Sequence, residues 1–161
     1  LCVSVLDNER VNYVKLGFPH DLDVVLCVPG LAISTQQARK ILPKKILLGD
    51  AVFSCSRVAF LLSALNQKRY DLLKLAMEDK LHQPYRKRLI PGFDNILREA
   101  YRAGALGVAL SGSGSSIVAI SNKRLAISKK IGQVMVEAFK KENIESRYLI
   151  LGIDREGTKI V

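Results

Sequence analysis

The sequence has few cysteines, histidines and aromatic residues, and it has no long apolar run. Its three cysteines stand singly without a C-x-x-C pair, and an odd number of isolated cysteines favours a reducing compartment, so we expect a cytoplasmic protein. The two histidines, His20 and His82, lie too far apart for a helical metal motif, and we expect no metal ligands. Because no stretch of about 18 apolar residues occurs, we expect no membrane span.

The composition that remains is typical of an ordinary globular domain. The 161 residues are 48% hydrophobic and 25% charged, which is close to the usual values and provides enough apolar surface to bury a core. Basic residues outnumber acidic ones by 25 to 15, so the net charge is +10. Short basic clusters are most often solvated faces, although a basic field also attracts nucleotides and other anionic ligands.

Strand-like and helix-like segments alternate along the chain. Residues 2–6 and 11–16 predict two strands joined by a polar turn, and the run at residues 23–28 predicts a strand buried on both faces. Ser34 and Gln37 have the spacing of a capping box, which predicts a short helix that Pro43 ends. Asp50 can cap a helix over residues 51–66 that is apolar nearly all round, and we therefore expect it to be deeply buried. The remaining predicted elements are helices over residues 70–79, 93–101 and 127–139 and strands over residues 106–110, 117–120 and 147–153.

From residue 23 onward, the order of these elements is strand, helices, strand, strand, helix, strand. This order predicts an α+β fold of the ferredoxin-like (split β-α-β) class, with extra helices inserted in the first crossover. We expect its sheet to be antiparallel, with the helices on one face. The strand pair in residues 1–22 does not fit this plan. We therefore expect it to belong to a preceding domain, the chain to be a fragment, and residues 23–161 to form its own domain.

The segment Ser111–Ser116 reads SGSGSS and joins two predicted strands. Its glycines can bring backbone N–H groups close to an anion, while its serines add hydroxyl donors. The alternative is a hairpin connection that needs positive φ angles. The segment is neither a Walker loop, because the G-x-x-x-x-G-K-[ST] pattern is absent, nor a Rossmann fingerprint.

Two arginines stand in settings that could bind a carboxylate. Thr35 and Arg39 are four residues apart on the capped helix and share a face. Arg86 lies in a basic segment between Pro84 and Pro91, which we expect to be an irregular but stiffened loop. Two guanidinium groups from separate segments can hold a carboxylate by bidentate hydrogen bonds, although each could equally be a surface arginine.

Four segments together carry a resemblance to a known family. In their order and at their intervals they resemble homoserine kinases of the GHMP kinase superfamily, over residues 24–153. The last of them is similar to the superfamily's third glycine-rich motif, and the others point to homoserine. The segments are Ser34-Thr35-x-x-Ala38-Arg39-x-x-Leu42-Pro43, Leu81-His82-Gln83-Pro84-Tyr85-Arg86, Leu89-Ile90-Pro91-Gly92-Phe93 and Leu110-Ser111-Gly112-Ser113-Gly114-Ser115-Ser116.

The resemblance implies the C-terminal domain of a GHMP kinase. Its reaction would transfer the γ-phosphoryl group of ATP, with Mg²⁺, to the side-chain hydroxyl of L-homoserine, a step in threonine biosynthesis. By this likeness Arg39 and Arg86 hold the homoserine carboxylate, with Thr35 facing the same site. The nucleotide-phosphate region is expected beside three loop residues, Gly112, Ser113 and Gly114. The likeness also permits a homodimer.

The sequence departs from the family pattern in two ways. Ser115 stands where the family commonly has proline, which would loosen the loop because proline fixes φ. The superfamily's main phosphate loop, similar to G-L-G-S-S-A, and its acidic metal-binding partner have no match in these 161 residues. We therefore expect ATP and Mg²⁺ to be bound mainly by an N-terminal domain, no catalytic residue in this chain, and no turnover by the chain alone.

Three other interpretations compete with this one. An RNA-binding RRM shares the strand order, but such domains stack bases on aromatic side chains of their central strands, and residues 108–110 and 117–120 carry none. We therefore expect no nucleic-acid partner. A non-catalytic amino-acid sensor on the same fold, or a GHMP kinase for another small alcohol, remains open from the residues alone.

Overall fold

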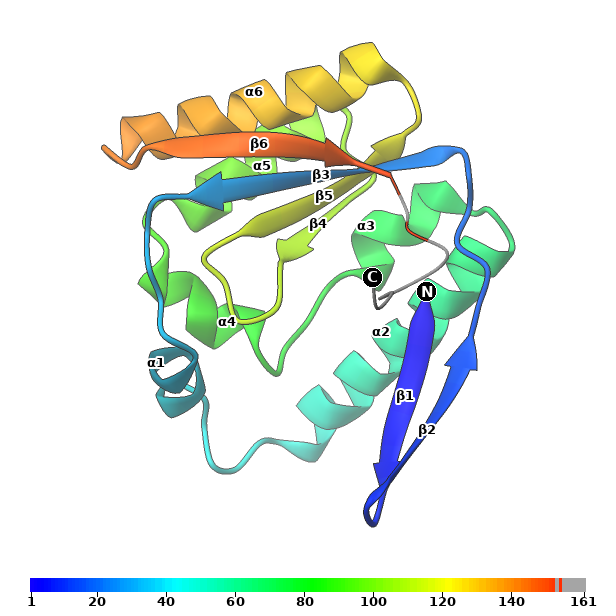
Figure 1. Ribbon diagram of the computed structural model, residues 1–161. Helices are drawn as coiled ribbons and strands as arrows, with labels where there is room; N and C mark the ends of the chain where they lie inside the picture. Colours follow the sequence, from blue (N-terminus) through cyan, green and yellow to red (C-terminus); the bar gives the residue numbers. More distant parts are fainter. Residues whose placement is uncertain (153, 155–161) are drawn as a thin grey trace, which may run out of the picture.

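The computed structural model describes residues 1–152 and 154, and in this part of the chain the strands form two antiparallel sheets. A hairpin of β1 (Cys2–Asp7) and β2 (Arg10–Lys15) stands apart from a four-stranded sheet (Figure 1). The larger sheet has the order β4-β5-β3-β6, from β3 (Leu22–Pro29), β4 (Gly107–Leu110), β5 (Ile117–Asn122) and β6 (Ser146–Leu151). This is the ferredoxin-like strand order, so the predicted fold class is confirmed. Position 153, at the end of the last predicted strand, lies outside the described residues.

Two long helices cover one face of the four-stranded sheet. They are α5 (Phe93–Arg102) and α6 (Leu125–Lys141), which pack against each other; in Figure 1, α6 runs above β6 and α5 lies behind the strands. The other helical elements belong to the crossover between β3 and β4. They are α1 (Thr35–Lys40), α2 (Leu48–Asn66), η1 (Tyr70–Leu72), α3 (Leu73–Ala76), α4 (Gln83–Arg86) and η2 (Lys87–Leu89).

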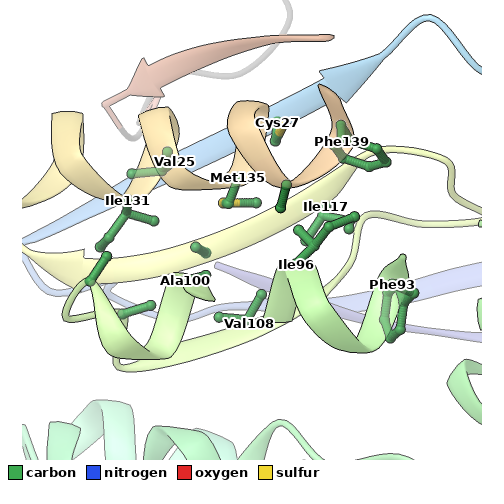
Figure 2. Close-up of a cluster of buried hydrophobic side chains, with 14 of the residues drawn as sticks. Val25, Cys27, Phe93, Ile96, Ala100, Val108, Ile117, Ile131, Met135 and Phe139 are labelled. Carbon is green, nitrogen blue, oxygen red and sulfur yellow. The ribbon is translucent and has the colours of Figure 1, made fainter. Parts of the chain in front are cut away.

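The main core lies between α5, α6 and the sheet (Figure 2). Side chains alternate along each strand, so Val25 and Cys27 of β3 face these helices and are fully buried. Ile131 and Met135, four residues apart on α6, are buried against them. The opposite face carries a smaller cluster, in which Leu22, Leu65, Leu73 and Ile120 are joined by Ala64.

Helix α2 differs from the prediction that it is deeply buried. It begins at Leu48 rather than at residue 51, and Asp50 lies inside its first turn, paired with Lys80 at 3.3 Å. Only three of its residues are buried, and Val58 is 60% exposed. The reason is that only its C-terminal end reaches the smaller core cluster, so most of its other apolar side chains are exposed or only partly buried. The expectation of deep burial was therefore wrong.

The same helix meets the length and composition of a membrane span. Over residues 48–66 its mean hydropathy is 1.5, and 17% of the window is buried. One such helix does not identify a membrane protein, because core helices and signal sequences meet the same criterion.

The segment around Pro84 also differs from the prediction. Residues 83–89 form α4 and η2 instead of an irregular loop, while the predicted helix over residues 70–79 ends at Ala76. Proline is well accepted in the first turn of a helix, where its missing N–H costs no hydrogen bond, and Pro84 occupies that position. Arg86 is therefore the last residue of a helical turn.

The β1–β2 hairpin forms as the sequence predicts, with Cys2 opposite Lys15. All of its strand residues are exposed. Its base lies beside the end of α2, where Leu1 and Leu16 line a pocket with Leu62 and Leu65. The assignment of residues 1–22 to a preceding domain stays a prediction.

Candidate functional site

Arg86 is the residue that joins the predicted site segments. Its side chain is half-buried, its Nε donates to the carbonyl of Ala38 at 3.3 Å, and its Nη1 donates to the carbonyl of Gly112 at 3.1 Å. Helix α1 and the glycine-rich loop are thereby held by one guanidinium, although they lie far apart in the sequence. A guanidinium carries five N–H donors, so three remain, which is enough for a bidentate contact with a carboxylate.

Helix α1 carries the other predicted substrate residues. Its capping box is present, since the Gln37 N–H donates to Ser34 Oγ at 3.1 Å and the Ser34 N–H donates to Gln37 Oε1 at 3.1 Å. Thr35 and Arg39 are exposed, one helical turn apart. Within the described residues the Arg39 guanidinium makes no hydrogen bond or ion pair. Arg86 contacts the carbonyl of Ala38, and Arg39 is the next residue in the chain. The backbone of Arg39 therefore lies close to the Arg86 guanidinium.

The loop between β4 and β5 is a tight hairpin turn. The Ser111 N–H donates to the Ser116 carbonyl at 2.9 Å, and the Gly114 N–H donates to the Ser111 carbonyl at 3.1 Å. Gly112 and Gly114 have φ angles of +61° and +86°, which residues other than glycine rarely adopt. The hairpin interpretation is thus confirmed, whereas contact with a nucleotide phosphate stays a prediction.

Ser115, which stands where the resemblance leads us to expect proline, is tied into the fold. It is 8% exposed, and its Oγ donates to the carbonyl of Leu31, which lies just before α1. The peptide bond between Gly114 and Ser115 is cis. A hydroxyl contact therefore fixes the loop at the position where proline would restrict φ.

Asp79, which the sequence did not single out, organises the turn that leads to α4. Its Oδ2 accepts the N–H groups of His82 at 2.6 Å and Gln83 at 2.7 Å, and its Oδ1 accepts the Leu81 N–H at 3.0 Å. Burial alone would raise the pKa of this carboxyl, but the three backbone N–H groups outweigh it and the pKa is lowered. The available signal was an acidic residue shortly before a proline in a first helical turn.

Gln83 is a second residue that the sequence reasoning missed. Its Oε1 accepts the Leu110 N–H at 2.9 Å, at the end of β4, and its Nε2 donates to the Met77 carbonyl at 3.4 Å. Leu110 lies two residues before Gly112. This side chain therefore fixes the first turn of α4 against the strand that enters the glycine-rich loop.

A cavity of about 380 Å³ lies beside Arg86, between α2, the turn before α4 and the end of β4. Arg86 and Gly112 line it together with His82, whereas the other four predicted site residues do not. Its wall on α2 is largely apolar and includes Val58 and Leu61. The cavity is large enough for a small molecule that has both an anionic and an apolar end.

No group of three or more His, Cys, Asp or Glu side chains is arranged to hold a metal ion in residues 1–152 and 154.

Comparison with known proteins gives the family. Residues 61–141 match the family described as GHMP kinases C terminal. The homoserine kinase of Persephonella marina is 47% identical over 98% of the chain and 51% of its own length, and that of Halothermothrix orenii is 41% identical over 96% and 49%. The crystal structure of homoserine kinase from Cytophaga hutchinsonii superposes with a TM-score of 0.87 at 38% identity, over 94% of the chain and 48% of that protein.

A more distant structure shares only the fold. Mevalonate kinase of L. major has a TM-score of 0.61 at 15% identity, over 92% of the chain and 48% of its own. The chain spans about half the length of the curated relatives it matches, and it corresponds to their C-terminal half. The chain belongs to the GHMP kinase family, of which it carries the C-terminal domain.

Proposed function

We propose that this chain is the C-terminal part of a kinase that transfers the γ-phosphoryl group of ATP to the side-chain hydroxyl of L-homoserine. Relatives named homoserine kinase match nearly the whole chain at 39–47% identity. The observation that carries the proposal is the half-buried Arg86 guanidinium, which joins α1 to the glycine-rich loop and keeps three donors for a ligand. Such a group suits the carboxylate of a small amino acid.

In this mechanism the chain's residues bind and orient the substrate. Arg86 and Arg39 hold the homoserine carboxylate from two elements, and Thr35 lies on the Arg39 side of α1. Holding that end of a short amino acid fixes the direction of its hydroxyl, and phosphoryl transfer depends chiefly on positioning and charge neutralisation. The loop at Gly112–Gly114 supports the nucleotide phosphates through its backbone N–H groups.

The other parts of the reaction are assigned to the N-terminal half that the relatives possess. We assign the Mg²⁺ ion and most contacts with ATP to that half, with no catalytic residue in this chain. The proposed protein is a cytoplasmic enzyme of amino-acid biosynthesis. A homodimer is compatible with it, and the molecular mass in solution tests that point.

The proposal is tested with a fusion protein in which the N-terminal half of the Persephonella marina homoserine kinase precedes residues 1–161. We expect a folded fusion protein to release ADP with ATP, Mg²⁺ and L-homoserine, and to leave mevalonate unchanged. We expect the 161-residue chain alone to form no product. The intact Persephonella enzyme is the positive control. A folded fusion protein that phosphorylates mevalonate, or neither alcohol, contradicts the proposed substrate.

The residues of the carboxylate site are tested by truncation. Arg39→Ala or Arg86→Ala in the fusion protein is expected to cost about 2–4 kcal/mol in transition-state binding of homoserine, because the carboxylate loses a charged partner in a site from which the bound substrate has displaced water. The KM for homoserine should rise far more than the KM for ATP. Equal increases in both would contradict the carboxylate site.

A further inference from the structure

The turn before α4 is held by an unusual concentration of hydrogen bonds on one side chain. The Asp79 carboxylate accepts three backbone N–H groups and also the hydroxyl of Ser54, at 3.3 Å from Oδ1. Both carboxylate oxygens therefore have two donors each, which leaves little capacity for any other partner. A carboxylate bound in this way is a structural anchor rather than a free acid or base.

Helix α4, which follows this turn, is too short to be stable without contacts from outside the helix. Helix α4 has four residues, and its N-cap residue His82 provides no side-chain cap. Short helices are unstable in isolation because fixing the first turn costs more than it returns. Asp79 supplies the missing acceptor to the N–H groups of His82 and Gln83, at 2.6 and 2.7 Å.

Two further contacts attach this turn to the rest of the domain. Ser54 of α2 accepts the Lys80 N–H at 3.1 Å in addition to its bond with Asp79. Gln83 accepts the Leu110 N–H at the end of β4. The turn is thus fixed to a helix on one side and to a strand on the other, and Arg86 lies at its C-terminal end.

We infer that Asp79 is a positioning residue for Arg86. By fixing the turn before α4, Asp79 determines where the Arg86 guanidinium meets α1 and the glycine-rich loop. The inference rests on the proposed function, because the consequence for catalysis is the placement of a carboxylate-binding group. If the turn is released, Arg86 loses the fixed backbone from which it reaches the Ala38 and Gly112 carbonyls, at 3.3 and 3.1 Å. Homoserine binding should then weaken more than ATP binding.

The test substitution is Asp79→Asn, which keeps the size of the side chain but replaces one accepting oxygen with an NH₂ group. The matched control is Asp71→Asn, because Asp71 is an exposed carboxylate of the same crossover whose ion pair is with Arg69, at 2.8 Å. Both variants lose one negative charge. Only the first removes acceptors from the turn that carries Arg86.

The first measurement is NMR hydrogen exchange on the labelled 161-residue chain. In Asp79→Asn we expect the His82 and Gln83 amides and the Arg86 Nε–H to exchange about tenfold faster or more, since hydrogen bonds to a charged acceptor are among the stronger ones. In Asp71→Asn their exchange should stay unchanged. If the Arg86 Nε–H exchanges at the same rate in the wild type and in Asp79→Asn, the inference is overturned.

The second measurement is the KM for each substrate in the fusion protein. We expect Asp79→Asn to raise the KM for homoserine about tenfold and the KM for ATP less than about twofold, a split that a general loss of stability would not produce. Equal increases in both would overturn the positioning role. If the wild-type fusion protein does not phosphorylate homoserine, the proposed function fails, while the exchange measurement still tests the link from Asp79 to Arg86.

A milder variant covers the case in which Asp79→Asn does not fold. Ser54→Ala removes one of the four hydrogen bonds to the carboxylate and the acceptor of the Lys80 N–H. It should raise the homoserine KM about threefold without a matching change for ATP. A folded Ser54→Ala protein with an unchanged homoserine KM would overturn the inference.

Discussion

Replacing Arg86 with lysine isolates the geometry of the guanidinium from its charge. The variant Arg86→Lys keeps the positive charge at the end of α4 but removes the planar group whose two nitrogens reach two carbonyls. Those bonds join α1 to the loop through the Ala38 and Gly112 carbonyls, at 3.3 and 3.1 Å. A lysine ammonium carries its three donors on one nitrogen, which cannot occupy the positions of both Nε and Nη1, so we expect it to retain one of these hydrogen bonds in the same geometry.

The size of the effect follows from the two hydrogen bonds that the guanidinium makes. Hydrogen bonds from charged donors contribute about 1.5–3 kcal/mol each, and the half-buried, partly solvated setting of Arg86 places them at the low end. Because lysine removes one bond and weakens the other, we expect the free energy of unfolding to fall by about 2 kcal/mol. For a chain of this size that corresponds to a decrease in Tm of about 4–8 °C.

The assay is urea unfolding of the 161-residue chain, followed by circular dichroism. The control is Arg88→Lys, because Arg88 is exposed and lies two residues further along the same basic segment. We expect the control to change stability by less than about 0.5 kcal/mol. If Arg86→Lys and Arg88→Lys have the same midpoint, Arg86 does not join α1 to the loop in solution.

Three further predictions concern single groups. Ser34→Ala should make the N3 amide of α1 exchange about fivefold faster in NMR, because a lost N-cap costs about 1 kcal/mol; an unchanged rate would contradict the capping box. Burial raises the pKa of Cys27 to about 11, so at about pH 8 a thiol reagent should label the exposed Cys2 and Cys55 and leave Cys27 intact until the chain unfolds. Despite its burial, Asp79 has a pKa below its usual 3.8 in the folded chain. Its contribution to stability is therefore complete above that pH and is lost as the pH falls through the folded pKa. In urea unfolding, the loss of unfolding free energy caused by Asp79→Asn should therefore become smaller in acid. A loss that does not change with pH would contradict this.

The parts of the fold that the sequence predicted are those set by local chemistry. The capping box of Ser34 and the positive φ angles of Gly112 and Gly114 depend on residues only a few positions apart. The strand order followed from the alternation of elements, since few topologies accommodate it. The family resemblance also rested on short segments, at positions 34–43, 81–86, 89–93 and 110–116.

The parts that the sequence did not predict depend on tertiary contacts. The apolar composition of α2 indicates which side chains avoid water, but it does not say which neighbour covers them, and Val58 is left 60% exposed. The sequence reasoning missed the acceptor for the first N–H groups of α4 because Asp79 lies three residues before the N-cap residue His82. From there its carboxylate accepts the N–H groups of His82 and Gln83. The contact between Arg86 and Ala38 joins residues 48 positions apart, and no local pattern predicts it.

Arg86 is the residue that we propose to bind the carboxylate of the substrate. The most direct test compares L-homoserine with aminopropanol, the amino alcohol that lacks this carboxylate, as substrates of the fusion protein and its Arg86→Ala variant. We expect the substitution to lower kcat/KM for homoserine at least about 30-fold more than kcat/KM for aminopropanol, because losing the contacts with the Ala38 and Gly112 carbonyls affects both substrates alike. If Arg86→Ala slows both substrates by the same factor, Arg86 does not recognise the carboxylate.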